Sequence, residues 1–590
     1  MSALAIAIVL AKAAVVVLFV LTVGGVLTWA DRRQGAMIQD RVGPNRAVVF
    51  IPAKAAMLLC VGPAIAIAGV FLWFVYGRNL EGAERTAYAV GYSHLAILLL
   101  WVTGLGIAAW IRRHGPGSAF DAFIAAAGDP RRFVYAGLAA HALALTAQLM
   151  LRGTELGRLL REIGLGSGPA LAAFAILGGA AYAAVSLRRR RRVGIRLMGL
   201  LHLMADGLKT LFKEDLVPPH ADRLLHGLAP IIGFFPGLVV LGVVPFGANL
   251  CLATDNGSIV GVLESVPRSG VCEQGAVTLQ VLDLDVGILF AFAVMGTGVV
   301  GAALAGWSSD NKFSLLGGLR AASQMVSYEV TLGLTLIGAL MVYGTLRVDQ
   351  MVQWQAAHAW GIFVQPLAFV LFFTAAVAET KRIPFDLPEG ESEIVAGYFT
   401  EYSGLKFAMF FIGEYVGIVA SSGLMAALFF GGWDVPFLDP DGLRVAIGDS
   451  VVFTQALAHP LIVLIGVLAF TAKVLALCWL QLTVRWTLPR FRYDQLMTLG
   501  WRKLLPVSLA NILATAVILL GVAAASPAVH EGLEWLAEIT ELVVALTGFG
   551  LAAWLVVFLL SPARHQRLVV TSSAKFAEAA GGTRTARMGA

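Results

Sequence analysis

The sequence has 590 residues, of which 58% are hydrophobic and 14% are charged, and its mean hydropathy is +0.80. A soluble core does not need so many apolar runs of about 20 residues, so the composition excludes an ordinary soluble protein and indicates an integral membrane protein. The formal net charge of +6 says little about partners, because the placement of the charges matters more than their sum.

Missing cofactor motifs narrow the function further. The cysteines at 60, 251, 272 and 478 form no CxxC motif and no Cys/His cluster, which argues against iron–sulfur, c-type haem and zinc sites. No GxGxxG motif follows a strand and there is no Walker loop, so the sequence shows no nucleotide site. We therefore expect a chain that binds no flavin, iron–sulfur cluster or metal and carries no electrons itself.

Apolar segments predict an all-α polytopic membrane fold with thirteen spans. The first segment is longer than the apolar core of a signal peptide, so we expect it to be retained as a span. The predicted spans are 4–29, 56–76, 93–111, 133–151, 168–187, 228–247, 286–306, 322–344, 361–378, 405–430, 455–482, 504–524 and 540–560.

The distribution of arginines predicts the orientation. With the N-terminus outside, the basic segments at 32–46, 112–132, 188–192 and 485–503 all fall on the cytoplasmic side, as the positive-inside rule requires. This predicts a multi-pass protein of the bacterial cytoplasmic (inner) membrane with a cytoplasmic C-terminus. The acidic loop at 379–406 is then cytoplasmic too.

Two features are predicted between the spans that end at 187 and begin at 286. Residues 202–213 form a short amphipathic helix on which Asp206, Lys209 and Lys213 share one polar stripe; a helix lying on the membrane surface explains the same pattern. Cys251 and Cys272 share an external loop, which suggests a disulfide, with two free buried thiols as the alternative.

Charged residues also occur deep inside predicted spans. Glu329 lies within 322–344, and a carboxylate at that depth is a functional candidate by default. Lys473 lies within 455–482 and can pair with an acid that the sequence does not identify.

The connection between the spans 361–378 and 405–430 is unusually acidic. The segment 379–414 contains seven carboxylates but only three basic residues. Glu379 and Glu414 lie at membrane depth, where a carboxylate costs roughly 2.5–3.5 kcal/mol on insertion scales, so both should face protein or water. Glu389 and Glu393 would share a face of a helix, with Glu391 turned away. A solvated loop is the alternative interpretation of the charge alone.

Five segments carry a family resemblance. They are DRRQGAMIQDRVGPNR (31–46), GLLHLMADGLKTLFKEDLVP (199–218), SYEV (327–330), ETKRIPFDLPEGESEIVAGYFTEYSGLKFAMFFIGEY (379–415) and LPRFRYDQLMTLGWRKLLPVSLAN (488–511). In this order they resemble the H-type membrane subunit of proton-pumping NADH:quinone oxidoreductase, respiratory complex I. The resemblance implies a membrane subunit that forms much of the quinone chamber and couples quinone reduction to proton translocation.

The resemblance also implies residue roles. Quinone would be the substrate, and the partners would be soluble quinone-site and iron–sulfur subunits, antiporter-like membrane subunits and lipids, without nucleic acid. The residues that the resemblance implies as quinone contacts are Arg41, Arg46, Arg382, Phe385 and Asp386. The proton path falls on Asp206, Glu329, Glu379, Glu389, Glu391, Glu393, Glu401 and Glu414, and partner docking on Arg490, Arg492, Tyr493 and Asp494.

The chain departs from the family pattern in three places. About 150 residues with four predicted spans separate the first two motifs, a further span follows the last one, and His202-Leu203 replaces the usual Gln-Pro. An even number of inserted spans returns the chain to the side that it left. The predicted domains are 1–47 (first span and chamber loop), 48–197 (insert), 198–535 (core bundle) and 536–590 (extra span and tail).

Two other functions fit parts of this pattern. The membrane anchor of a related hydrogenase-type complex need not bind quinone, and the intact PFDLPEGESEIVAGY and FRYDQLM segments argue against it. A stand-alone ion antiporter would place its acids at paired helix breaks in mid-membrane, whereas here they cluster in a cytoplasmic loop.

Overall fold

The computed structural model describes residues 3–39, 43–44, 49–52, 55, 192–195, 199–255, 258–263, 266, 272, 275–388, 390, 394–447 and 450–560. The four spans predicted between 56 and 187 lie outside the described residues, as does the tail after 560.

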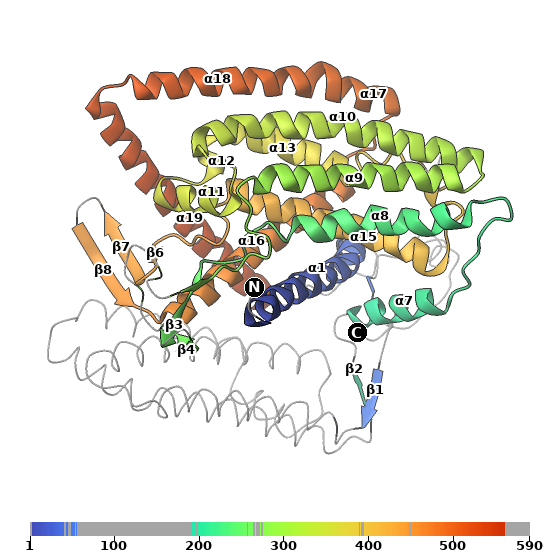
Figure 1. Cartoon of the computed structure of the whole chain (residues 1–590), viewed down its shortest axis with the longest axis horizontal. Helices are drawn as coiled ribbons and strands as arrows, with labels where there is room; N and C mark the ends of the chain where they lie inside the picture. The colour runs from blue at the N-terminus through green and yellow to red at the C-terminus, as the bar shows by residue number, and fades with distance from the viewer. Residues whose placement is uncertain are drawn as a thin grey trace, which may run out of the picture. The chain divides into compact units, whose positions relative to one another are not determined.

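Long apolar helices make up the bundle (Figure 1). Seven helical stretches among the described residues are long and apolar enough to cross a membrane, and α13 is a shorter apolar helix. The chain is thus an all-α multi-pass membrane protein. The main helices are α1 (Ala3–Ile38), α8 (Arg223–Val240), α9 (Gly287–Ser308), α10 (Lys312–Tyr343), α13 (Pro366–Glu379), α15 (Gly404–Phe429), α16 (His459–Thr487), α18 (Leu505–Ala523) and α19 (Pro527–Leu560).

Several helix ends differ from the predicted spans. Helix α10 begins ten residues before the predicted 322, because Asn311 caps it by accepting a hydrogen bond from the Phe313 amide. The span predicted at 361–378 is instead a four-residue helix, α12 (Gly361–Val364), followed by α13, which starts at Pro366. Helix α13 has 14 residues, about 21 Å, and is shorter than the hydrocarbon core.

Glycines allow the closest helix contacts. A Cβ added to Gly301 of α9 would lie 2.5 Å from the backbone nitrogen of Gly233 in α8, and one added to Gly306 would lie 2.9 Å from the Cα of Gly318 in α10. Small residues at helix crossings let membrane helices pack through their backbones. These glycines therefore hold α8, α9 and α10 together as one layer of the bundle.

Short helices connect the long ones. The predicted amphipathic helix is present as α7, and none of its residues is buried. A π-helix, η3, joins α17 to α18 without a break in the helical path. These elements are α7 (Leu201–Phe212), α11 (Val348–Ala357), η2 (Gly397–Phe399), α17 (Tyr493–Thr498) and η3 (Leu499–Leu504).

Among the described residues, the strands are few and lie in the connections between helices. Two antiparallel three-stranded sheets have the orders β4-β3-β5 and β6-β7-β8, and β1 pairs with β2 in the antiparallel register Val49↔Ile195 to Pro52↔Arg192. The strands are β1 (Val49–Pro52), β2 (Arg192–Ile195), β3 (Leu250–Asp255), β4 (Ser258–Val262), β5 (Ala276–Val277), β6 (Leu438–Asp439), β7 (Gly442–Ile447) and β8 (Ser450–Ala456).

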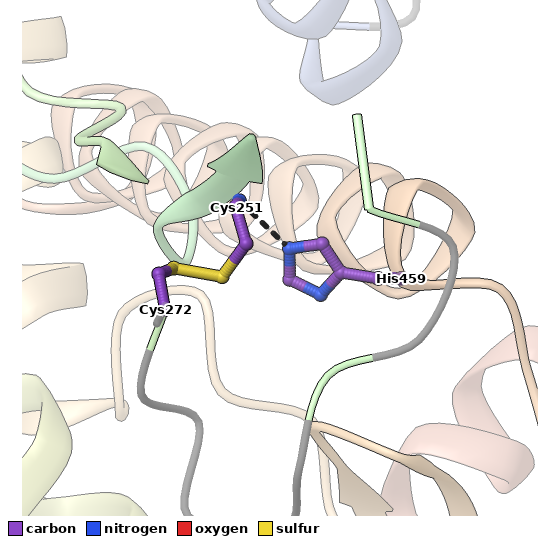
Figure 2. The surroundings of a disulfide bond; sticks show 3 residues. All are labelled: Cys251, Cys272 and His459. Atoms are coloured by element: carbon purple, nitrogen blue, oxygen red, sulfur yellow. Dashed lines mark hydrogen bonds between the residues drawn. A yellow bond between two sulfur atoms is a disulfide. The ribbon is translucent and has the colours of Figure 1, made fainter. Parts of the chain in front are cut away.

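The predicted pairing of Cys251 with Cys272 is present as a disulfide, with Cα atoms 5.2 Å apart (Figure 2). The backbone amide of Cys251 donates to Nε2 of His459 at 3.2 Å, so the disulfide lies at the first residue of α16.

Contacts divide the chain into two compact units. One comprises Met1–Ala47 and Arg196–Ala545, and the other comprises Val48–Ile195 and Leu546–Ala590. All the described candidate site residues belong to the first unit. The functional domains assigned from the sequence stay predictions.

Candidate functional site

The loop after α13 is fixed to the bundle by a glutamine. Gln324, on α10, is fully buried, and its side-chain nitrogen donates to the carbonyl oxygens of Ala378 and Phe385, both at 2.7 Å. A buried amide that bonds two backbone carbonyls holds both at a defined separation. The predicted quinone contacts Arg382 and Phe385 therefore sit on a backbone that α10 positions.

Aromatic contacts join this loop to the segment before α17. Phe385 stacks on Phe491 with ring centroids 5.5 Å apart, and the Phe491 amide donates to the carbonyl of Pro384 at 3.0 Å. The Tyr328 hydroxyl donates to the carbonyl of Leu496 at 3.0 Å. Two predicted motifs that lie about 100 residues apart in the sequence thus form one structure.

A charged contact reinforces this junction. Arg490 bonds the backbone oxygen of Asp386, and its guanidinium lies 3.7 Å from the Asp386 carboxylate, which is buried. A predicted docking residue therefore contacts a predicted quinone residue inside the chain. Arg492 and Asp494 pair at 3.7 Å on the surface, and Tyr493 is exposed beside them, as a docking surface requires.

Arg382 and Glu414 form a buried ion pair. The distance between Nη2 of Arg382 and Oε2 of Glu414 is 2.6 Å, and the side chains are 6% and 4% exposed. The guanidinium also lies over the ring of Tyr415, 4.6 Å from its centroid. The mutual attraction of the two charges in a low dielectric offsets the cost of desolvating them, so a change of charge on either partner must be compensated nearby.

Polar contacts continue from Tyr415 to Asp31, an acid to which the sequence assigned no role. The Tyr415 hydroxyl donates to Oδ2 of Asp31 at 2.8 Å, and Trp486 Nε1 donates to Oδ1 at 2.7 Å. Arg485 forms an ion pair with the same carboxylate. Asp31 is buried near the end of α1. The available signal was its place as the first residue of the first motif (31–46), but the predicted span 4–29 ended before it.

Glu329 and Glu379 are close enough to interact electrostatically. Glu379 ends α13 and is buried, while Glu329 is half-buried on α10. Glu329 packs against α9 where a Cβ at Gly296 would lie only 2.6 Å from its Oε1. Two carboxylates that interact in a buried region disfavour simultaneous ionisation, so this pair can hold a proton.

Two other predicted acids each have a side-chain partner among the described residues. Nδ2 of Asn311 donates to Glu401 at 2.7 Å, so Glu401 is tied to the cap of α10. Asp206 of α7 pairs with Arg32 at 2.5 Å, and both side chains are about half exposed. The predicted residues Arg41, Arg46, Glu389, Glu391 and Glu393 lie outside the described residues.

Lys473 lies beside Asp434 and contacts its backbone oxygen. The ammonium donates to the backbone oxygens of Asp434 and Gly432 at 2.6 and 3.0 Å and lies 4.1 Å from the centroid of the Trp360 ring. Trp360 Nε1 donates to the Asp434 carboxylate at 2.9 Å. Burial raises the pKa of Asp434. This cluster follows the C-terminus of α15, whereas Glu414 of the Arg382–Glu414 pair lies in the N-terminal half of that helix.

Comparison with known proteins gives the family. The family model described as NADH dehydrogenase matches residues 170–516, a range that leaves out the first motif and α19. Among the described residues, no group of three or more His, Cys, Asp or Glu side chains could hold a metal ion.

Individual relatives agree with the family model. The chain is 44% identical over 322 residues to an H-type subunit of the NADH-quinone oxidoreductase of Koribacter versatilis, covering 54% of this chain and 84% of that protein. It is 38% identical over 322 residues to the corresponding subunit of Cytophaga hutchinsonii (55% and 84%). It is 41% identical over 329 residues to an NADH-quinone oxidoreductase subunit of Rhodothermus marinus that carries the number 8 (55% and 85%). This chain belongs to the NADH dehydrogenase family.

Proposed function

We propose that the chain is the H-type membrane subunit of a proton-translocating NADH:quinone oxidoreductase, a multi-subunit enzyme of the bacterial cytoplasmic membrane. The N-terminus is external, and the loop 380–403 lies on the cytoplasmic side. There it meets the soluble quinone-site and iron–sulfur subunits, while antiporter-like subunits and lipids contact the spans. Quinone is the substrate, and its electrons come from a neighbouring subunit.

The observation that carries the proposal is the junction of the loop 380–403 with α10 and the segment 488–499. Gln324 fixes the loop, Phe385 stacks on Phe491, and Arg490 contacts Asp386. A quinone needs an apolar, aromatic wall along its ring and polar groups near its oxygens. Phe385 offers the aromatic wall, and Asp386 offers a polar group for a quinone oxygen.

The coupling role rests on the buried charges next to this junction. Reduction of a quinone to a quinol takes up two electrons and two protons, so it changes the charge in the chamber. The Arg382–Glu414 pair, Tyr415 and Asp31 link α15 to α1 and α16 through adjacent polar contacts. In a low dielectric, a charge change at one member shifts the protonation of the next, which can move protons at a distance.

Asp386→Asn tests the quinone role in the purified native complex. Because the carboxylate becomes neutral while its size is kept, we expect a raised apparent KM for quinone before kcat falls. The matched control is Asp283→Asn, a carboxylate that pairs with Arg347 at 2.6 Å just before the start of α9. An unchanged KM in Asp386→Asn, or an equal rise in both variants, would count against the role of Asp386.

A further inference from the structure

A histidine outside all the assigned roles lies beside the proposed proton path. His226, in the first turns of α8, is fully buried. Its ring stacks on Tyr402, with centroids 4.0 Å apart and an angle of 4° between the planes. Tyr402 follows Glu401 directly, so α8 places an imidazole against the end of the loop 380–403.

Four polar atoms gather at this place, and none of them makes a hydrogen bond of good geometry with the described residues. They are both ring nitrogens of His226, the Tyr402 hydroxyl and Oγ of Ser308. The backbone of Glu401 is close enough to the imidazole for a weak hydrogen bond, and so are Ser308 and Ser309 to the Tyr402 hydroxyl. A buried polar group left without a partner costs about 1–3 kcal/mol, so several such groups together indicate a small polar ligand.

The three side chains are held close by the backbone. The amide of Asp222, the cap of α8, donates to the carbonyl of Ser308 at 3.2 Å, which ties the end of α9 to the turn before His226. Ser309 already donates its hydroxyl proton to the carbonyl of Ala305 at 2.7 Å. Water both donates and accepts, and it needs two to four polar partners, which this corner supplies.

Charged groups from three elements face the imidazole. Glu401 is held by Asn311 at 2.7 Å, and Lys406 of α15 pairs with Asp215 at 2.9 Å. All three charges act on His226 electrostatically. The histidine therefore lies between an acid of the proposed proton path and an ion pair at the edge of the bundle.

We propose that His226, Tyr402 and Ser308 bind ordered water, and that His226 relays protons through this water to Glu401. An excess proton that arrives through the water adds to one ring nitrogen, and the proton on the other nitrogen then passes on toward Glu401, so the imidazole returns to its neutral form as the other tautomer. This inference rests on the proposed function, because it adds a branch to that proton path.

The residue types suit a relay at neutral pH. An imidazole has an ordinary pKa near 6.5, so it can gain and lose a proton in the working range. Burial raises the pKa of Tyr402 to about 12, so its hydroxyl keeps its proton and serves as a fixed donor. The relay thus has one titrating member and two hydrogen-bonding members.

Substitutions in the purified native complex separate the relay from packing. His226→Phe keeps a ring stacked on Tyr402, His226→Gln keeps a polar side chain, and neither titrates near neutral pH. We expect both to lower quinone reductase turnover by up to about tenfold and to change its dependence on pH between about 5.5 and 8.5, because general acid–base groups contribute through their titration. Wild-type turnover and pH profile in His226→Phe would overturn the relay.

A second measurement does not depend on the variants. A high-resolution electron-microscopy map of the wild-type complex should show water density between the His226 ring, the Tyr402 hydroxyl and Ser308 Oγ. A dry corner with these groups bonded to one another would overturn the proposal even if the variants failed to assemble. Absence of quinone reductase activity in the wild-type complex would instead contradict the proposed function and leave the water site to be decided by the map.

Discussion

At the scale of single residues, Arg382 is the group on which the site depends. It bonds Glu414 at 2.6 Å and covers the face of Tyr415, and both charges are almost fully removed from solvent. Breaking a buried pair leaves one charge uncompensated, at a cost of about 3–5 kcal/mol, whereas removing both charges can be nearly neutral.

Arg382→Gln and Glu414→Gln should therefore each lower the thermal stability of the purified complex, and the double variant should recover most of the loss. Subunit dissociation on heating measures this. The exposed pair gives the control: Arg492→Gln and Asp494→Asn should each change stability by about 1 kcal/mol or less. A double variant no more stable than the weaker single variant would contradict the pairing.

Glu391 and Glu393 test whether acids of the loop do more than shape it. Replacement by Gln keeps volume and hydrogen bonding and removes the titration. We expect the variants to assemble and bind quinone analogues, while turnover and pumping fall together because an uncompensated charge step stalls the cycle. Glu534→Gln on the exposed side of α19 is the control. Normal pumping in both variants would remove these acids from the path.

At the scale of elements, apolar runs predicted which helices exist, but partners far away in sequence set the ends and the contacts. Helix α10 starts before the predicted span because Asn311 caps it, and hydropathy carries no information about helix caps. Asp31 was not assigned a role because its partners Tyr415 and Arg485 lie more than 380 residues along the chain. The contact of Arg490 with Asp386 could not be predicted for the same reason, because sequence motifs identify candidate residues but not which of them contact one another.

The disulfide lies at the N-terminal end of α16. Cys251 and Cys272 are 21 residues apart, and closing such a loop is worth roughly 3 kcal/mol. Cys251→Ser with Cys272→Ser should lower the thermal midpoint of the complex and leave quinone reductase activity unchanged at low temperature. The reason is distance: Arg485, which binds Asp31, lies 26 residues, about 39 Å, along α16 from His459. Loss of activity at unchanged stability would show that this loop serves the site.

At the scale of the whole molecule, the insert is predicted to pack at the periphery and not to line the chamber. Strands β1 and β2 pair at its two ends, with Pro52 opposite Arg192, so the chain leaves and returns at neighbouring points. Replacing 53–191 by Asn-Gly, a turn that joins such strands, should leave an assembled complex with quinone reductase activity. Assembly with complete loss of quinone binding would refute the peripheral placement.

The orientation of the molecule rests on its arginines and stays a prediction. Cysteines placed at 190 and 584 should be labelled only from the cytoplasmic side, and those at 268 and 444 only from outside, because basic segments are retained in the cytoplasm. If a cysteine at position 190 were labelled from outside intact cells, the result would contradict the four-span insert.

The central claim is that buried charges near the quinone junction couple reduction to proton translocation. Proton uptake measured together with quinone reduction, in inverted vesicles carrying the assembled Arg382→Gln/Glu414→Gln complex, tests it most directly. The account predicts that turnover and pumping fall together by about tenfold or more, because the neutral pair passes no charge. Pumping and turnover at the wild-type level in this variant would contradict it.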